Sequence, residues 1–439
     1  MPETFTEVLE IEVDPRRALV HEAGWQSWSP EGTYPVAATS PRPRRAVWQT
    51  MAFRPERPAP AGGFQGEGLL AVDPGDGGPV RLVAGGKLPA EVPSVRAELV
   101  TPTTLQVSAN GPVTVSETPD PLPAALAGWA TRLAEAAGLA RPRPIPPVWC
   151  SWYCYWRGVT AADVATNEAD ARRLGIGVEV IQIDDGWQAA IGDWDAVDPR
   201  FGDLAACVGQ LRERGRAVGI WLAPFLAVPG SRLASEHPEW LVPEVSAGFN
   251  WDAPLRVLDS THPGAAEYLH SCVRRLAELG ISYFKFDFLY AAAVEGARHR
   301  DLDAIAAYRE AMALLRDAAG PGATVLGCGA PLLPSLGLVD AMRISPDVMP
   351  SWEPPEGDVS QPGGRSAVLG GAARAHMNGR FWLNDPDCLL ARPGVEHREA
   401  WADHLRAVGG LASSSDPLAA LDDWGLAVTR ELLGTDAGS

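Results

Sequence analysis

The sequence predicts an α/β protein in which a (β/α)8 TIM barrel follows an N-terminal all-β sandwich domain. After Pro147, apolar segments typical of strands alternate with amphipathic segments typical of helices, giving eight strand segments in a region close to the usual barrel length of about 250 residues. Before that point, short β-prone runs are separated by turns rich in proline and glycine. Alternation alone would also allow a doubly wound sheet, but no glycine-rich phosphate loop follows the first strand of the repeat.

The composition of the chain limits the kinds of partner and substrate to be expected. The chain has 439 residues and a net charge of −18, which argues against nucleic acid or anionic membranes as partners and fits a neutral substrate. No secretory signal and no membrane-length apolar run is visible, so a cytoplasmic location is expected. The six cysteines form no disulfide framework, and neither they nor the eight histidines have metal-ligand spacing. We therefore expect no metal and no cofactor; the sequence leaves the oligomeric state open.

The N-terminal domain is expected over residues 1–120. Its strand segments are spaced as in a sandwich and cover residues 4–13, 17–24, 68–72, 80–84 and 105–117. A helical stretch at 122–139 and a stiff proline-rich run at 141–147 then form a linker over residues 121–147.

The barrel is expected over residues 148–430, followed by a tail at 431–439. Its eight strands are predicted at residues 148–153, 178–184, 217–225, 281–288, 324–329, 341–347, 381–387 and 407–413. Helices are predicted between them, among others at residues 161–174, 204–214, 264–279 and 302–318. Most of these strands end in polar or aromatic residues, and in a barrel such ends meet at one mouth.

The strand at 281–288 reads ISYFKFDF and carries Lys285 and Asp287 two residues apart. Alternation along a strand puts both side chains on one face. Buried charges are costly unless they are paired or used. The pair is therefore either a carboxylate kept ionised at the edge of a site or a structural ion pair in the core.

A second group follows the strand at 178–184, where Asp184 and Asp185 precede Gly186 and Trp187. Two adjacent carboxylates suit hydroxyl groups or a divalent cation, and the absence of further ligands nearby favours sugar hydroxyls. The indole of Trp187 suits the apolar face of a sugar. Asp185 alone could instead cap a helix.

A third group lies in the segment MRISPD, residues 342–347. If this segment is a strand, Arg343 and Asp347 point the same way but lie roughly 13 Å apart. Asp347 would then be free of its neighbour and able to keep a proton. Near the preceding strand end, Cys328 has no motif-linked histidine, which favours a packing or lining role over a nucleophilic one.

Two carboxylates facing one mouth, one charge-paired and one able to hold a proton, are the groups needed for glycoside hydrolysis. In its motifs the chain resembles the α-galactosidases of glycoside hydrolase family 36, from GWQSWS at residues 24–29 to about residue 430. The matching motifs are WCSWY at 149–153, DDGW at 184–187, GDW at 192–194, GIW at 219–221, KFD at 285–287, CG at 328–329, the segment from Arg343 to Asp347, and WLND at 382–385.

The resemblance implies a retaining mechanism with Asp287 as nucleophile and Asp347 as acid/base. It implies sugar binding by the remaining matched residues, which are Asp184, Asp185, Lys285, Arg343, Trp221, Trp187, Trp152 and Cys328, and by a tryptophan of the N-terminal domain, Trp25 or Trp28. The substrate implied is an α-galactoside oligosaccharide. The family usually has a C-terminal β-domain, which we expect to be absent from this chain.

Alternatives remain at this stage. A galactosyl transferase of the raffinose-synthase type and an α-N-acetylgalactosaminidase fit the same motifs. A non-catalytic carbohydrate-binding barrel is a candidate from another class, although both catalytic acids are present. A Schiff-base aldolase or isomerase using Lys285 is disfavoured, because Asp287 would keep the amine protonated.

Overall fold

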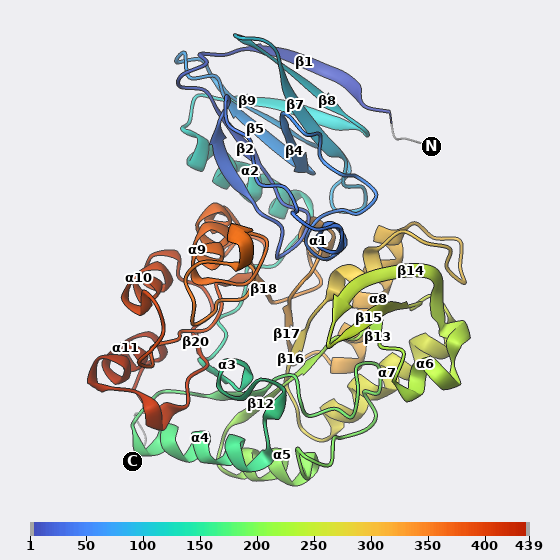
Figure 1. Ribbon diagram of the computed structural model, residues 1–439, viewed down its shortest axis with the longest axis vertical. Coiled ribbons are helices and arrows are strands. Elements are labelled where there is room, and N and C mark those ends of the chain that lie inside the picture. Colours follow the sequence, from blue (N-terminus) through green and yellow to red (C-terminus); the bar gives the residue numbers. More distant parts are fainter. Residues whose placement is uncertain (1–3, 436–439) are drawn as a thin grey trace.

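The computed structural model describes residues 4–435. Two antiparallel sheets form the N-terminal part, shown in blue and cyan in Figure 1. One has the strand order β1-β8-β7-β4, with β1 Thr6–Glu12, β8 Thr104–Ala109, β7 Ser94–Thr101 and β4 Phe64–Glu67. The other has the order β3-β2-β5-β6-β9, with β3 Gly32–Pro35, β2 Leu19–Glu22, β5 Leu69–Asp73, β6 Val80–Gly85 and β9 Val113–Thr118.

Apolar side chains from both sheets meet in one hydrophobic core, which includes Ile11 of β1, Val72 of β5 and Val107 of β8. The segment predicted as one strand at 105–117 is in fact two strands, β8 and β9, which belong to different sheets. The chain crosses between the sheets at residues 110–112, where Gly111 and Pro112 interrupt the pairing.

The second part is α/β, as predicted. Its eight-stranded parallel sheet has the order β19-β18-β17-β16-β12-β11-β10-β20 and curls into an arrangement that fits a TIM barrel. The strands are β10 Val148–Cys150, β11 Val180–Ile183, β12 Ala217–Leu222, β16 Tyr283–Phe286, β17 Thr324–Gly327, β18 Ala341–Arg343, β19 Leu383–Asp385 and β20 Ser413–Ser414. Backbone hydrogen bonds bring its two edges together, from Leu411 N–H to the Asn384 carbonyl at 2.8 Å and from Leu389 N–H to the Ser413 carbonyl at 2.8 Å.

Helices cover the outside of this sheet (Figure 1). They are α4 Ala161–Arg173, α5 Leu204–Glu213, α7 Pro263–Glu278, α8 Ala304–Ala319, α9 Gly364–Ala373, α10 Arg398–Val408 and α11 Asp423–Leu433. Their starts follow capping chemistry, because the side chains of Thr160, Asp203 and Asp303 accept hydrogen bonds from the first-turn amides of α4, α5 and α8. The four helices predicted between strands are present with nearly the expected bounds.

Two of the predicted barrel strands contain helix. Trp152 and Tyr153 belong to the short helix α3, Trp152–Tyr155, and residues 407–408 end helix α10. The remaining predictions locate the strands correctly but extend them past their carboxyl ends. The chain leaves the sheet once it reaches the mouth, where polar side chains replace apolar ones.

Between β12 and α7 the chain adds a small antiparallel sheet of β13 Leu226–Ala227, β14 Leu241–Asn250 and β15 Ala253–Leu258, with the short helix α6 Arg232–Glu236 before β14. Helix α1, Ala46–Ala52, packs on β14 (Figure 1). Helix α2, Leu122–Ala136, packs between the second N-terminal sheet and the 3-10 turn Ala375–Met377 of the barrel. The N-terminal part is therefore seated on the barrel beside its mouth.

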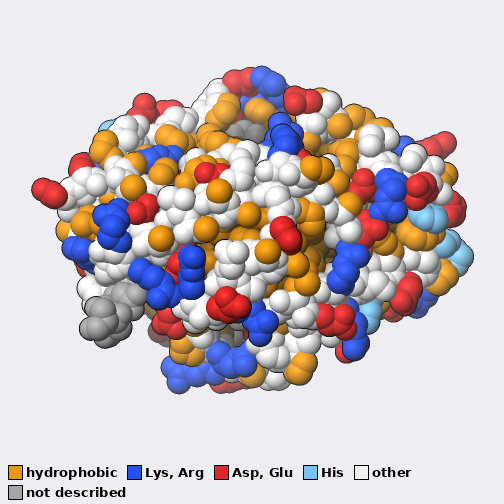
Figure 2. Space-filling view, turned by 90° about the horizontal axis from the view of Figure 1, so that it is seen from below, with side chains coloured by type: hydrophobic (Ala, Val, Ile, Leu, Met, Phe, Trp, Pro, Cys, Tyr) orange, Lys and Arg blue, Asp and Glu red, His pale blue; other side chains and the backbone are white. Residues whose placement is uncertain are grey.

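On the face shown in Figure 2, acidic and basic side chains are interspersed, and no extended area of one sign is visible. None of the helices within residues 4–435 combines the length and apolar character required to cross a bilayer.

Candidate active site

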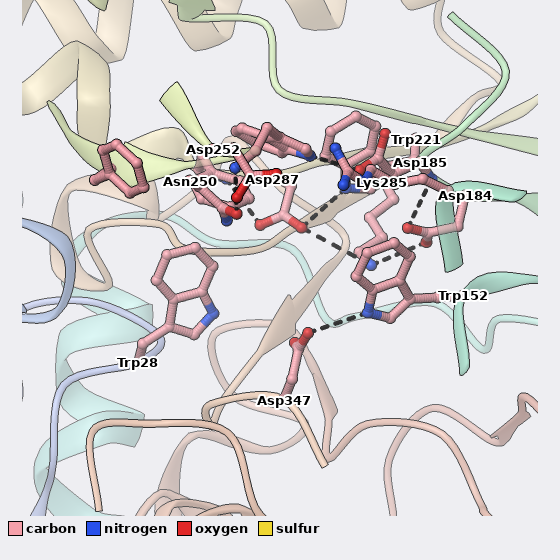
Figure 3. A pocket seen from close by; sticks show the side chains of 14 residues that line it. Trp28, Trp152, Asp184, Asp185, Trp221, Asn250, Asp252, Lys285, Asp287 and Asp347 are labelled. Atoms are coloured by element: carbon pink, nitrogen blue, oxygen red, sulfur yellow. Dashed lines mark hydrogen bonds and ion pairs between the residues drawn. The ribbon is translucent and has the colours of Figure 1, made fainter. Parts of the chain in front are cut away.

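A cavity of about 340 Å³ opens where the barrel strands end. It is lined by Trp28, Trp152, Arg157, Asp184, Asp185, Trp221, Phe249, Asn250, Trp251, Asp252, Lys285, Asp287, Phe288 and Asp347. In Figure 3, Asp287 and Asp347 face the cavity from opposite sides, and the rings of Trp28 and Trp152 flank the space between the two carboxyl groups. Strand ends far apart in the sequence thus bring several carboxylates around one space, as expected for a barrel mouth.

Lys285 is a buried cation of this cavity wall. Its Nζ lies 3.0 Å from Oδ2 of Asp184 and 3.9 Å from Oδ2 of Asp287, and its side chain is buried. Burial opposes the charged amine, but the two carboxylates outweigh it and hold the pKa of Lys285 well above its usual range. The ammonium therefore pairs more closely with Asp184 than with Asp287, the partner that the sequence suggested.

Asp287 is also held by two neutral donors. The indole N–H of Trp221 donates to Oδ2 at 2.9 Å, and the backbone N–H of Phe288 donates to Oδ1 at 2.8 Å. Phe288 has a φ of 52°, in the left-handed region that a phenylalanine rarely adopts. Local strain of this kind is typical of functional sites. Asp287 thus accepts hydrogen bonds on both of its carboxylate oxygens.

The prediction that Arg343 and Asp347 lie roughly 13 Å apart is wrong. Strand β18 ends at Arg343, the chain turns at once, and Nη1 of Arg343 contacts Oδ1 of Asp347 at 2.9 Å. The same guanidinium contacts Asp385 at 3.0 Å and Asp387 at 2.9 Å. One cation is therefore shared among three carboxylates.

This sharing leaves the group with excess negative charge. Burial raises the pKa of Asp347 above its usual range, although Arg343 and Lys285 act in the opposite direction. Burial likewise raises the pKa of Asp387 to about 7. Asp347 also accepts a hydrogen bond from the indole N–H of Trp152 at 3.3 Å. The cluster around Arg343 can therefore retain a proton near neutral pH, and Asp347 is its member that lines the cavity.

Four lining residues that sequence reasoning missed lie at the tip of the β14–β15 hairpin: Phe249, Asn250, Trp251 and Asp252. The hairpin turns through Trp251 and Asp252, whose φ angles are 51° and 56°. Two consecutive positive φ values are typical of a type I′ turn, which normally uses asparagine or glycine. The indole N–H of Trp251 donates to Oδ2 of Asp185 at 2.7 Å, so the hairpin tip reaches the carboxylates of β11.

The alternating apolar residues on each side of Asn250 were the available signal for this hairpin. Arg157 and Phe288 also line the cavity and were not predicted to do so. Arg157 follows the short helix α3, and Phe288 directly follows Asp287.

Trp28 lines the cavity, whereas Trp25 lines a different one within the N-terminal part. The Trp28 indole packs edge-on against Phe288, with ring centroids 4.9 Å apart. A Cβ added to Gly329 would lie 2.8 Å from the Trp28 ring. The small residue at this strand end therefore makes room for an aromatic side chain of the N-terminal part.

Three residues expected at the sugar do not line the cavity. Trp187 is buried and donates its indole N–H to the Trp221 carbonyl at 2.8 Å, so it supports the wall from behind. Cys328 is fully buried beneath the mouth, and burial raises the pKa of its thiol well above its usual range. Arg343 is occupied by its three carboxylates. All three side chains are buried outside the cavity, which a linear motif does not show.

The other predicted site residues all line the cavity, namely Trp28, Trp152, Asp184, Asp185, Trp221, Lys285, Asp287 and Asp347. No histidine lines it. Within residues 4–435, no group of three or more histidine, cysteine or acidic side chains is arranged to hold a metal ion.

The chain is similar in sequence and in fold to known α-galactosidases. The family model described as Melibiase matches residues 131–316. A solved α-galactosidase from Thermus thermophilus, TtGalA in complex with p-nitrophenyl α-D-galactopyranoside, is 30% identical, with 99% of this chain and 90% of that chain covered and a TM-score of 0.80. The same enzyme in complex with stachyose also has a TM-score of 0.80.

More distant matches agree in fold. AgaA of Geobacillus stearothermophilus, a GH36 α-galactosidase, has a TM-score of 0.66 at 15% identity, with 97% of this chain and 61% of that chain covered. Among curated proteins, the AgaA sequence is 27% identical over 167 residues, which is 36% of this chain and 22% of AgaA. The matched region thus spans about a fifth of the length of this curated relative.

Proposed function

Because the chain belongs to the α-galactosidases of glycoside hydrolase family 36, we propose that it hydrolyses terminal α-galactosides with retention of the anomeric configuration. The observation that carries this proposal is the placement of Asp287 and Asp347 on one cavity in unlike environments. Asp287 is surrounded by donors and a cation, whereas burial raises the pKa of Asp347. A retaining glycosidase needs one ionised and one protonated carboxyl group.

In the first step, a carboxylate oxygen of Asp287 bonds to the anomeric carbon. The glycosidic C–O bond breaks, and its electron pair goes to the leaving oxygen, which takes the proton from Asp347. The product is a covalent galactosyl ester of Asp287. In the second step, water attacks the anomeric carbon and gives its proton to Asp347, while Asp287 leaves as carboxylate. The net reaction consumes one water and restores both residues.

Recognition of galactose is assigned to the lining residues. We propose that Asp184 and Lys285 bind the axial 4-hydroxyl and that Asp185 binds the 6-hydroxyl, while Trp152, Trp221 and Trp28 frame the ring. Their shared position on the cavity supports this assignment. A hydrogen bond to a charged group contributes about 1.5–3 kcal/mol. An epimer with an equatorial 4-hydroxyl leaves these charges unpaired, so glucosides should react far more slowly.

Arg343 is proposed to act on Asp347 rather than on the sugar, since it is buried away from the cavity. Trp187 and Cys328 are proposed to support the wall. The two N-terminal sheets with their common core support the sandwich domain expected from sequence.

The transferase, N-acetylgalactosaminidase and non-catalytic alternatives are not favoured by the relatives. TtGalA and AgaA are described as α-galactosidases, and the solved complexes of TtGalA contain p-nitrophenyl α-D-galactopyranoside or stachyose.

Proton NMR of the first product formed from p-nitrophenyl α-galactoside tests the proposal directly. We expect α-galactose to appear first and to mutarotate afterwards. β-Galactose as first product would exclude retention, and no release of nitrophenol would exclude the activity. The matched p-nitrophenyl α-glucoside should be turned over at least about 10³-fold more slowly.

A further inference from the structure

The turn that carries Trp28 is fixed to the barrel by backbone contacts. Gln26 forms an isolated antiparallel bridge with Pro331, and Ser27 N–H donates to the Ala330 carbonyl at 3.1 Å. These contacts attach the turn to the loop that follows β17. They do not by themselves set the distance between Trp28 and Asp347, which follows a different strand, β18.

Arg374 makes that second connection. It directly follows helix α9 and is fully buried. Its Nη1 donates to the Ser27 carbonyl at 2.6 Å and to the Ile344 carbonyl at 2.7 Å. Nη1 of Arg374 thus links Ser27, which precedes Trp28, to Ile344, which follows Arg343.

The rest of the guanidinium is also occupied by the same turn. Nη2 donates to the carbonyls of Gln26 at 3.2 Å and Ser29 at 2.8 Å, so three carbonyls of the turn converge on Arg374. A Cβ added to Gly24 would lie 2.5 Å from Nη2, which shows how closely the turn wraps the guanidinium. A lysine could not satisfy this set, because its single ammonium lacks the planar fork of arginine.

Glu31 supplies the negative charge that such a buried cation needs. Its Oε2 accepts from Nε of Arg374 at 3.0 Å and from Gly24 N–H at 3.0 Å, and its side chain is fully buried. His21 lies 3.5 Å from the other oxygen. Glu31 therefore closes the turn at its N-terminal side and fixes the guanidinium at the same time.

We propose that Arg374, held by Glu31, is a positioning residue that sets Trp28 and Asp347 at their separation across the cavity. The inference rests on the proposed hydrolysis of α-galactosides. It assigns to a side chain outside the cavity the task of coupling the N-terminal wall to the acid/base.

The test compares Arg374→Met, Arg374→Lys and Gly24→Ala with the wild-type chain. Gly24→Ala displaces the guanidinium without removing a charge, so it remains informative if Arg374→Met does not fold. Arg316→Met is the matched control, because Arg316 pairs with Asp340 at the other end of β18. Each variant is assayed with aryl α-galactosides of graded leaving-group acidity, alongside its thermal midpoint.

We expect the three variants to raise KM about 10-fold and to slow substrates with poor leaving groups more than those with good ones, since Asp347 is displaced. In a Trp28→Ala background, Arg374→Met should raise KM less than about 2-fold. Arg316→Met should lower the thermal midpoint and leave KM and the leaving-group dependence unchanged.

If the folded Arg374 and Gly24 variants keep the wild-type KM and leaving-group dependence, the positioning role is excluded while the proposed activity stands. If the effects of Arg374→Met and Trp28→Ala are fully additive, coupling through Trp28 is excluded. Absence of turnover by the wild-type chain would count against the proposed function instead.

Discussion

Arg343 contacts Asp347 at 2.9 Å, yet it does not belong to Asp347 alone, since Asp385 and Asp387 lie within 3.0 Å of the same guanidinium. A single positive charge among three carboxylates cannot keep all of them ionised at low cost. The acid/base function proposed for Asp347 therefore depends on residues that never reach the cavity.

Asp387→Asn should lower the pKa at which the acid/base loses its proton. Removing one competing carboxylate leaves more of the charge of Arg343 to Asp347, which stabilises its ionised form. The basic limb of the pH profile of kcat/KM should move to lower pH by about 1 unit. Asp340→Asn, at the opposite end of β18, should leave the profile in place. A basic limb that stays fixed or moves to higher pH in Asp387→Asn contradicts this account.

Asp287→Ala and Asp347→Ala should differ in how they depend on the leaving group. Without Asp287 no covalent intermediate forms, so kcat should fall by at least about 10³-fold for every aryl galactoside. Without Asp347, substrates with acidic leaving groups should keep much of their first-step rate, because they need no proton. Steady-state kinetics with nitrophenyl and phenyl α-galactosides separates the two patterns. Wild-type rates in both variants would end the assignment.

Trp251→Phe should weaken substrate binding while preserving the hairpin. The change removes the indole donor to Asp185 at 2.7 Å but keeps an aromatic ring beside Phe288. Burial already raises the pKa of Asp185, and the hydrogen bonds from Gln188 and Trp251 oppose that rise. Losing one of them should raise KM about 10-fold. Trp424→Phe on α11 is the aromatic control, and equal KM values in both variants would exclude a binding role for the indole N–H.

Acid should destabilise the fold through His376. Burial lowers the pKa of His376 to about 4 from its usual 6.5, and its Nδ1 is within 3.1 Å of the Ala373 carbonyl. In the unfolded chain the His376 imidazole binds a proton as the pH falls through 6.5, whereas in the folded chain it binds one only near pH 4. The unfolding free energy should thus be unaffected above pH 6.5 and fall between pH 6.5 and 4, by at most about 1.4 kcal/mol per unit from this residue.

Urea unfolding at pH 7, 6, 5 and 4.5 measures this slope, and His376→Gln should flatten it. The Glu31 carboxyl affects stability in a lower pH range. Burial opposes its ionisation, but Arg374 and His21 lower its pKa to about 2 from 4.5, so its stabilisation is lost only as the pH falls below 4.5. An equal slope in the wild type and in His376→Gln would show that other groups cause the loss.

Much of the fold could be predicted from local pattern, because the barrel strands and the helices between them carry strong periodicity. The placement of Lys285 and Asp287 on one face at the end of β16 could also be predicted, because residues two apart on a strand share a face. The error at Arg343 and Asp347 has a simple cause. A separation of roughly 13 Å requires an extended chain from Arg343 to Asp347, whereas pairing with β19 stops at Arg343 and the backbone then turns.

The site could be predicted where its residues lie near strand ends, and the family resemblance added Trp25 or Trp28, of which Trp28 lines the cavity. Trp28 comes from another part of the chain, and its contact with Gly329 depends on how that part docks. Phe249–Asp252 lie on an insertion whose hairpin carries no glycine at its turn, so the usual signal was absent. Trp187 follows one predicted strand and Cys328 lies near the end of another, but both are buried outside the cavity, because packing rather than position in a motif decides which side chains line it.

The small antiparallel sheet of β13, β14 and β15 contributes four residues of the cavity wall, yet no barrel strand runs through it. The groups proposed to break the bond and those at the hairpin tip therefore occupy separable parts of the scaffold. A library randomised at residues 249, 250 and 252 would sample new preferences for ring substituents and aglycones while keeping the hydrogen bond from Trp251 to Asp185, so these three positions are the natural starting point for directed evolution of the protein.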